Sequence, residues 1–163
     1  NELTFSTFNV RTVAVNGVNG IGDADTLLRT CAAKAYEVIG LHQTKSDGTS
    51  EIVASGYRIY FSGDCSGVKG RKGQHELGLA TKETIVKKAD MDSIANECIS
   101  ARLLKARNSI KLNFVTFIAV YAPTEEAPEG QKVRYMAALN STVVSVSARE
   151  CVFILTDANA RTG

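Results

Sequence analysis

Polar side chains recur where apolar, strand-like runs of this sequence end. They are Asn9 after LTFSTF, Gln43 after VIGLH, Tyr121 after FVTFIAV, and Asp157 and Asn159 after CVFILT. In layered α/β folds, functional sites are built at the ends of strands. An Asp-x-Asn pair behind an apolar strand can ligate a metal ion, or it can simply close an Asx-turn. Both interpretations stay open from the residues alone.

Strands and two helices must position these residues. Apolar alternation and short continuous apolar runs predict strands at 3–10, 38–41, 56–62, 77–82, 99–107, 111–122 and 151–157. The run 38–41 is apolar throughout, as in a strand covered on both faces. Segment 46–51 predicts a loop, and 83–96 is ambiguous. The elements together indicate an α/β or α+β architecture.

The two helices are predicted from their periodicity. The first is expected at 26–37, with Asp23 or Asp25 as its N-cap. The second is expected at 131–148. Its predicted buried residues follow a helical spacing: Val133, Met136, Ala137, Asn140, Val143 and Val144.

Composition sets broad limits on the function. The chain has 163 residues, of which 44% are apolar and 22% are charged, and this fits one domain with its own core. A net charge of +2 is too small to indicate a nucleic-acid partner by itself. No apolar run is long enough for a membrane span. The four cysteines, 31, 65, 98 and 151, are too far apart for a CxxC pair, so we expect four reduced thiols and an intracellular, nuclear or cytoplasmic location.

Four motifs occur in a familiar order: TFNVRT, IGLHQTK, VYAPT and ILTDANARTG. Over the whole chain they resemble the endonuclease/exonuclease/phosphatase superfamily of DNase I-like and apurinic endonuclease-like enzymes. The likeness is strongest to the RTE type of LINE retrotransposon endonuclease domains and to the craniofacial development protein 2 family, with approximate motifs WNVRTL, IGLQETK, VYAPT and GDFNAxxG. The resemblance implies an α/β sandwich of two sheets with outer helices. It also implies hydrolysis of DNA phosphodiesters with Mg²⁺ or Mn²⁺.

The resemblance assigns roles to individual residues. It implies that Asn9 orients the catalytic carboxylates, Tyr121 contacts the scissile phosphate, Asp157 positions the water and binds metal, and Asn159 steadies the phosphate. Thr124 matches a polar position near the substrate. Without the resemblance, Asn9 would be a strand-end residue capping its own turn, and Tyr121 a half-buried aromatic.

One departure from the motifs concerns the metal. Gln43 matches the metal-binding Glu of the family, and it keeps an oxygen but loses the negative charge that a Mg²⁺ site prefers. His42 stands where the family commonly has Gln, and His suits softer metals. Because neighbouring strand residues face opposite ways, exchanging their order cannot restore the carboxylate. Arg11 is neutral for activity, and Thr156 replaces a Gly.

The second departure is one of length. Residues 1–163 match a single domain in its N-terminal part, whereas the family's second half supplies another metal-facing Asp and a late His. A half-sandwich would expose the inner face of its sheet, from which we expect a partner chain or self-association.

Val68–His75 is a Gly-rich basic segment. Its Lys69, Arg71 and Lys72 can contact DNA phosphates or simply form a solvated loop, and His75 is interpreted as loop.

The sequence therefore predicts a retrotransposon-derived DNA endonuclease-like domain whose hydrolysis is impaired. The alternative is a non-catalytic binding or structural module of nuclease ancestry.

Overall fold

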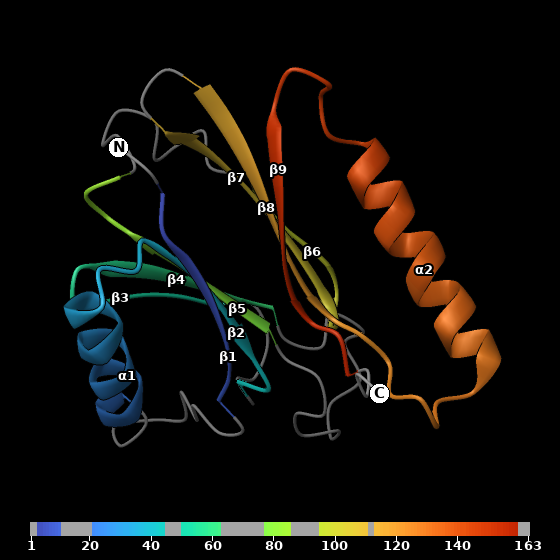
Figure 1. The fold of residues 1–163 in the computed structure, drawn as a ribbon, viewed down its shortest axis with the longest axis horizontal. Helices are drawn as coiled ribbons and strands as arrows, with labels where there is room; N and C mark the ends of the chain where they lie inside the picture. Colours follow the sequence, from blue (N-terminus) through green and yellow to red (C-terminus); the bar gives the residue numbers. More distant parts are fainter. Residues whose placement is uncertain are drawn as a thin grey trace.

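A computed structural model describes residues 3–10, 21–44, 50–62, 77–85, 95–110 and 113–159. Its two mixed sheets and two helices form an α/β sandwich (Figure 1), as the sequence predicts. The first sheet has the order β1-β2-β5-β4-β3 and the second has the order β6-β7-β8-β9. The first sheet comprises β1 (Phe5–Asn9), β2 (Val38–His42), β3 (Ser50–Ala54), β4 (Tyr57–Ser62) and β5 (Leu77–Lys82), and the second comprises β6 (Ala95–Ser100), β7 (Leu103–Ile110), β8 (Asn113–Tyr121) and β9 (Cys151–Asp157).

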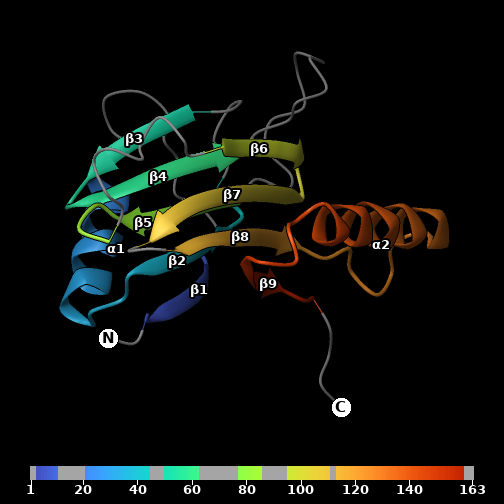
Figure 2. The same cartoon turned by 90° about the horizontal axis from the view of Figure 1, so that it is seen from above.

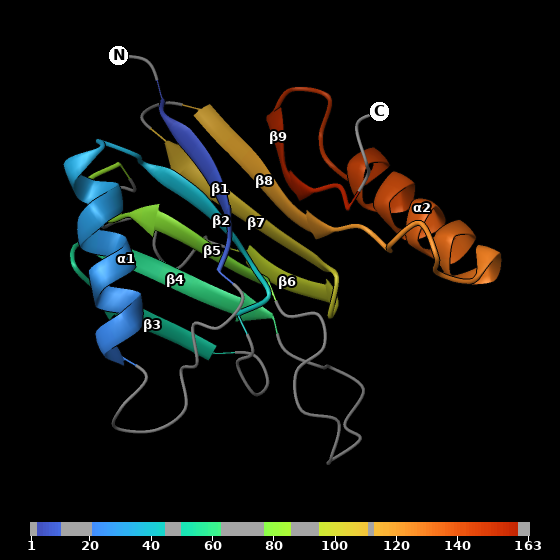
Figure 3. The same ribbon diagram turned by 60° about the horizontal axis from the view of Figure 1, so that its bottom comes forward.

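Each sheet contains one parallel pair of strands at the same side of the sandwich. β1 pairs with β2 in parallel, and β8 pairs with β9 in parallel, whereas the other pairings are antiparallel. Seen from above, the two outermost strands β1 and β9 lie on one side and β3 and β6 on the other (Figure 2). β1 therefore approaches β9 although the two strands are far apart in the sequence (Figure 3).

The helices cover the outer faces of the two sheets. α1 (Ile21–Ala33) packs on the first sheet through Leu28 and Cys31, which contact the cluster around Ile39 and Leu41. Val38 of the same strand belongs instead to the core between the sheets. All five residues of β2 are buried, which confirms the prediction that this apolar run is covered on both faces.

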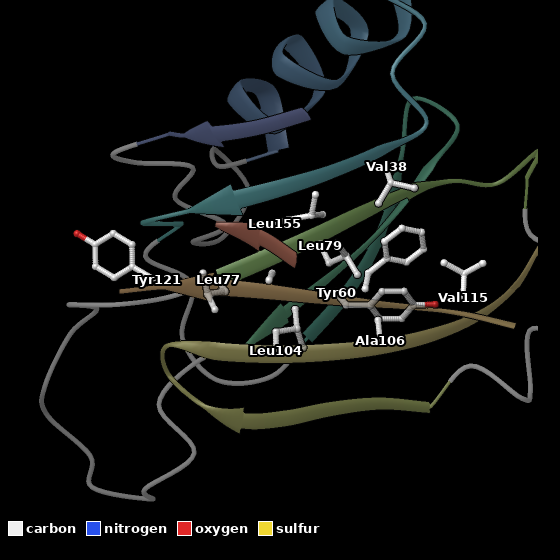
Figure 4. Close-up of a cluster of buried hydrophobic side chains, with 11 residues drawn as sticks. Val38, Tyr60, Leu77, Leu79, Leu104, Ala106, Val115, Tyr121 and Leu155 are labelled. Atoms are coloured by element: carbon white, nitrogen blue, oxygen red, sulfur yellow. The ribbon is translucent and has the colours of Figure 1, made fainter. Parts of the chain in front are cut away.

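The inner faces of the two sheets pack against each other. Figure 4 shows this core, and its aromatic part is the contact of Phe153 with Phe5 and Phe117, at centroid distances of 4.5 and 5.8 Å. The buried residues are Val38, Tyr60, Leu77 and Leu79 from one sheet and Leu104, Ala106, Val115, Phe117, Ala119, Tyr121 and Leu155 from the other. The predicted exposed inner sheet face is therefore wrong for the described residues, and the partner chain or self-association that was inferred from it stays a prediction.

The second helix, α2 (Glu129–Val144), covers the outer face of the second sheet. It packs there through Tyr135, Leu139 and Val143. The predicted buried face is wrong except at Val143, because Val133 and Met136 are both 58% exposed and Val144 is 73% exposed. The helix has apolar residues on two faces. The face with the large side chains of Tyr135 and Leu139 packs on the sheet, because it buries more apolar surface than the face with Val133 and Met136.

Three further elements differ from their predictions. β3 occupies a segment predicted partly as loop, and β6 begins within the segment that was ambiguous. α1 begins at Ile21, so Asp25 lies inside the helix and cannot cap it. Its carboxylate instead accepts hydrogen bonds from Arg29 one turn later and from Ser55 beside β3. The tertiary contact to Ser55 has no local sequence signal.

The cysteines differ from the prediction as well. Cys98 is disulfide-bonded, whereas Cys31 and Cys151 are free thiols, so the prediction of four reduced cysteines is wrong at Cys98. The intracellular location that rested on reduced thiols stays a prediction. Within the described ranges, no helix has the length and apolar character needed to cross a membrane.

The two sheets approach each other closely at Gly40, and a larger residue there should destabilise the fold. A Cβ on this β2 residue would lie 2.9 Å from Leu155 Cβ of β9. We expect Gly40→Ala to lower the free energy of unfolding by about 1–3 kcal/mol, since the crowded core must shift to admit the methyl group. Urea denaturation of the wild type and the variant measures this difference in the free energy of unfolding.

Gly130→Ala is the matched control. The nearest atom to its added Cβ is a flexible Arg134 nitrogen at 3.8 Å, in the first turn of α2. The helix propensity of alanine should leave stability equal or higher. Equal effects of the two substitutions would contradict the inferred sheet contact.

Candidate functional site

The polar strand ends predicted from the sequence meet at one end of the sandwich. Asn9 lies opposite His42 in the β1–β2 register, and Tyr121 lies opposite Asp157 in the β8–β9 register. The carboxyl ends of parallel partners lie at the same end of a sheet, and packing of the two sheets brings these ends together. Figure 4 shows Tyr121 at the end of the core, with its hydroxyl directed away from the other labelled side chains.

Asp157 is held from both sheets. Asn9 Nδ2 donates to Asp157 Oδ2 at 2.8 Å, and the backbone N–H of Asn159 donates to Oδ1 at 3.2 Å. The second bond closes an Asx-turn, so this reading of the Asp-x-Asn pair is confirmed. Asn159 adopts the left-handed conformation (φ 45°), which Asn tolerates better than most residues. The carboxylate orientation is fixed by neutral donors.

Gln43 and Tyr121 form a direct pair. Gln43 Nε2 donates to Tyr121 Oη at 2.6 Å. Gln43 has a φ of 62°, a left-handed conformation that is uncommon for this residue type and is often found at functional sites. The turn takes Gln43 out of the strand alternation. Consequently His42 and Gln43 both approach Tyr121, and the expectation that these neighbours face opposite ways is wrong.

A second layer of contacts lies behind Tyr121, and the sequence did not indicate it. Arg102 Nη1 donates to the carbonyl oxygens of Tyr121 and Ala122 at 3.3 and 3.2 Å, and its guanidinium carbon lies 5.3 Å from the Tyr121 ring centroid. Asn159 Nδ2 donates to the same Ala122 oxygen at 2.7 Å. A single arginine in a predicted hairpin carries no pattern that would reveal this contact.

His42 forms the floor of the site. Its ring is fully buried, and neither nitrogen has a hydrogen-bond partner in the structure. Burial lowers the pKa of His42 below 6.5, because the charged form is poorly solvated there; the Asp157 carboxylate opposes this shift in part. The buried hydroxyl of Thr44 also lacks a partner.

Thr124 lies at the rim of the site. Together with Asn159, Glu125 and Glu126 it lines an open pocket of about 510 Å³. Its role near a substrate stays a prediction, while the two glutamates make this side of the rim acidic. An anionic group would approach the site more easily from another direction.

The described residues do not fit the Mg²⁺ or Mn²⁺ site that the resemblance implies. Asp157 contributes a carboxylate whose two oxygens already accept hydrogen bonds, and Gln43 turns its amide nitrogen toward Tyr121. In the part of the chain that the structure describes, no group of three His, Cys, Asp or Glu side chains could hold a metal ion. A hard divalent cation prefers more negative oxygen ligands than this.

Several predicted residues lie outside the described ranges. They are Arg11, Lys69, Arg71, Lys72 and His75. The structure therefore brings together Asn9, Gln43, Tyr121, Asp157 and Asn159, with Thr124 at the rim, and leaves the basic segment as a sequence-based prediction.

Comparisons with known proteins bear on this geometry. No protein-family model matches the chain. Craniofacial development protein 2 of Bos taurus is 25% identical over 163 residues, which is 99% of this chain and 25% of that protein. D. rerio TDP2 complexed with single strand DNA product superposes with a TM-score of 0.61 at 13% identity, covering 98% of this chain and 61% of that chain. The endonuclease domain of TRAS1, a telomere-specific non-LTR retrotransposon, has a TM-score of 0.54 at 12% identity, covering 83% and 52%.

This chain has the DNase I-like fold. The resemblance to endonuclease/exonuclease/phosphatase proteins predicted from four motifs is thereby confirmed at the level of structure. The chain spans about a quarter of the curated relative and between half and two thirds of these two solved chains. In the DNase I-like fold of this chain, Asn9, Gln43, Tyr121, Asp157 and Asn159 share one end of the sandwich.

The buried His42 makes stability depend on pH. Its pKa is lowered in the folded state, so below pH 6.5 the unfolded chain binds a proton that the folded chain does not. Stability is therefore lost as the pH falls below 6.5, by up to about 1.4 kcal/mol per pH unit. Urea denaturation in EDTA at several pH values should show this slope in the wild type and a smaller slope in His42→Gln.

The control is His75→Gln, which removes the other histidine of the chain. The decrease in slope caused by His42→Gln between pH 6.5 and 5 should exceed the decrease caused by this control. An identical slope in wild type and His42→Gln would contradict the burial of a neutral His42.

Proposed function

We propose that this chain is a nucleic-acid-binding domain of endonuclease type in which phosphodiester hydrolysis is impaired. The observation that carries the proposal is the Gln43–Tyr121 hydrogen bond inside an otherwise assembled site. Asn9, Asp157 and Asn159 retain the mutual contacts expected of such a site, but the position of the second carboxylate holds a neutral amide.

A phosphate group suits the polar donors of the site. The Tyr121 phenol and the amides of Asn9, Gln43 and Asn159 are neutral groups that can hydrogen-bond anionic oxygens. Their anchoring to strand ends and turns reduces the entropy lost on binding. Binding of phosphate therefore needs no change in the fold.

Hydrolysis demands more than binding. The phosphodiester reaction develops negative charge on the phosphate and leaving oxygens, and a divalent cation would supply the compensating positive charge. Asp157 can accept a proton from water, because Asn9 and Asn159 fix its two oxygens. Gln43 offers no second negative charge with which to hold the cation, so we infer slow turnover.

The comparisons favour nucleic acid as the bound phosphodiester. TDP2 of D. rerio was captured with a single strand DNA product, and TRAS1 contributes an endonuclease domain of a retrotransposon. Both share the fold of this chain. We infer that single-stranded DNA is the first ligand to test. The alternative, a module without catalysis, shares this binding step.

Gln43→Glu should raise activity. In a supercoiled-plasmid nicking assay with Mg²⁺ or Mn²⁺, we expect the variant to nick about 10²-fold faster than the wild type, because the added carboxylate strengthens metal binding. Mn²⁺ titration followed by electron paramagnetic resonance should show tighter binding by the variant. Gln131→Glu on α2 is the matched control, and it should change neither readout.

Two outcomes would contradict the proposal of impairment. One is rapid wild-type nicking that Asp157→Ala abolishes, which would make this chain an active endonuclease. The other is tight Mn²⁺ binding by wild type. If neither protein nicks and neither binds Mn²⁺, the non-catalytic alternative is supported.

The basic segment should contribute to DNA affinity. Fluorescence anisotropy with labelled single-stranded DNA should give an affinity that falls with salt. We expect the triple Ala variant of Lys69, Arg71 and Lys72 to reduce the slope of log affinity against log salt by about 2, since each lost phosphate contact removes about 0.7.

The control removes three basic residues elsewhere, Lys132, Arg134 and Arg149, on and just beyond α2. It should leave the slope closer to that of the wild type. Equal loss in the two triple variants would contradict a specific role for the segment and would indicate binding by net charge alone.

A further inference from the structure

Arg102 connects the turn between β6 and β7 to the end of β8. It lies in the turn between β6 and β7, and its backbone carbonyl accepts from the N–H of Tyr121 at 3.0 Å. Its side chain continues past the end of β8, where Nη1 donates to the carbonyls of Tyr121 and Ala122. Backbone and side chain of one residue thus hold the last residues of β8 from the same direction.

The carbonyl of Ala122 is the point at which the two halves of the site are joined. It accepts from Arg102 Nη1 at 3.2 Å and from Asn159 Nδ2 at 2.7 Å, while the Ala122 N–H donates to the Asp157 carbonyl at 3.0 Å. Asn159 in turn donates its backbone N–H to the Asp157 carboxylate. A shift of Ala122 would therefore move Asn159 and change the orientation of Asp157.

The guanidinium also acts on the ring of Tyr121. Its central carbon is 5.3 Å from the ring centroid, within the range of cation–π contacts. Tyr121 is thereby held by Arg102 at its ring and its carbonyl and by Gln43 at its hydroxyl. A lysine would reproduce this arrangement only in part, because its ammonium can donate to carbonyl oxygens but lacks the planar guanidinium that lies over the Tyr121 ring.

We infer that Arg102 is a positioning residue of this site, which sets Tyr121 and Asn159 in the geometry that a bound phosphodiester requires. The inference rests on the proposed function for its effect on turnover, whereas the positioning itself is a property of the protein without substrate. Arg102 acts through Tyr121 and Ala122.

The test uses two readouts on the whole chain. The first is nuclear magnetic resonance of the Tyr121 ring and the Asn159 side-chain amide, assigned with Tyr121→Phe and Asn159→Asp. Arg102→Met should shift both sets of signals, and Arg102→Lys should shift them less. Arg134→Met, which removes an exposed arginine of α2, is the control and should shift neither.

The second readout is nicking in the Gln43→Glu background. There Arg102→Met should lower kcat about 10²-fold, as expected for a misplacement near 1 Å, with little change in KM. Added guanidinium ion should restore part of the lost rate in an Arg102→Ala variant. A stability defect alone would not be rescued by a small cation that fills the place of the side chain.

The outcomes separate this inference from the proposed function. Unchanged Tyr121 and Asn159 signals in a folded Arg102→Met variant would overturn the positioning role. Shifted signals together with the guanidinium rescue would support both claims. Shifted signals with no nicking in any Gln43→Glu protein would support positioning by Arg102, while the proposed impaired hydrolysis would fail and the non-catalytic alternative would hold. If Arg102→Met does not fold, Arg102→Lys decides by the same signals.

Discussion

The hydrogen bond between Asn9 and Asp157 joins the ends of two strands from different sheets, and the site exists only where those sheets meet. Face-to-face packing of the sheets sets the distance between the two strand ends. Phe5, Phe117 and Phe153 fill the space between them, and Gly40 allows β2 to approach Leu155. A change in this packing would separate the donors Asn9 and Gln43 from the acceptors Asp157 and Tyr121 without altering any of these residues. The geometry of the site therefore depends on the packing of the core.

The neutral side chain of Gln43 also has a consequence for the protein without metal. A glutamate there would have no N–H to donate, whereas the Gln43 amide donates a hydrogen bond to the Tyr121 hydroxyl. The site is thus ordered by its own donors, although buried His42 and Thr44 lack partners.

Sequence patterns predicted the central strands β2, β8 and β9 well, because continuous apolar runs are local signals. The strand-end polar residues Asn9 and Asp157 meet in the structure, while their functional roles stay predictions. The patterns failed where tertiary contacts decide. The buried face of α2 depended on which of two apolar stripes fits the sheet, and the approach of Gln43 to Tyr121 depended on a left-handed residue. Arg102 was missed because its role consists of contacts to carbonyls 19 and 20 residues away.

The described residues assemble this site although the chain spans only part of the solved structures that share its fold. The topology gives the reason. The two parallel pairs, β1–β2 and β8–β9, lie on the same side of the sandwich, so two of the four strands that carry the site, β1 and β9, are also the outermost described strands of that side. Hydrogen bonds across the sheets and the contacts of Arg102 fix these edges from within. Edge strands are usually the least restrained part of a sheet. Here the polar network restrains them, and the residues that would bind a phosphodiester are the same residues that hold the two edges together.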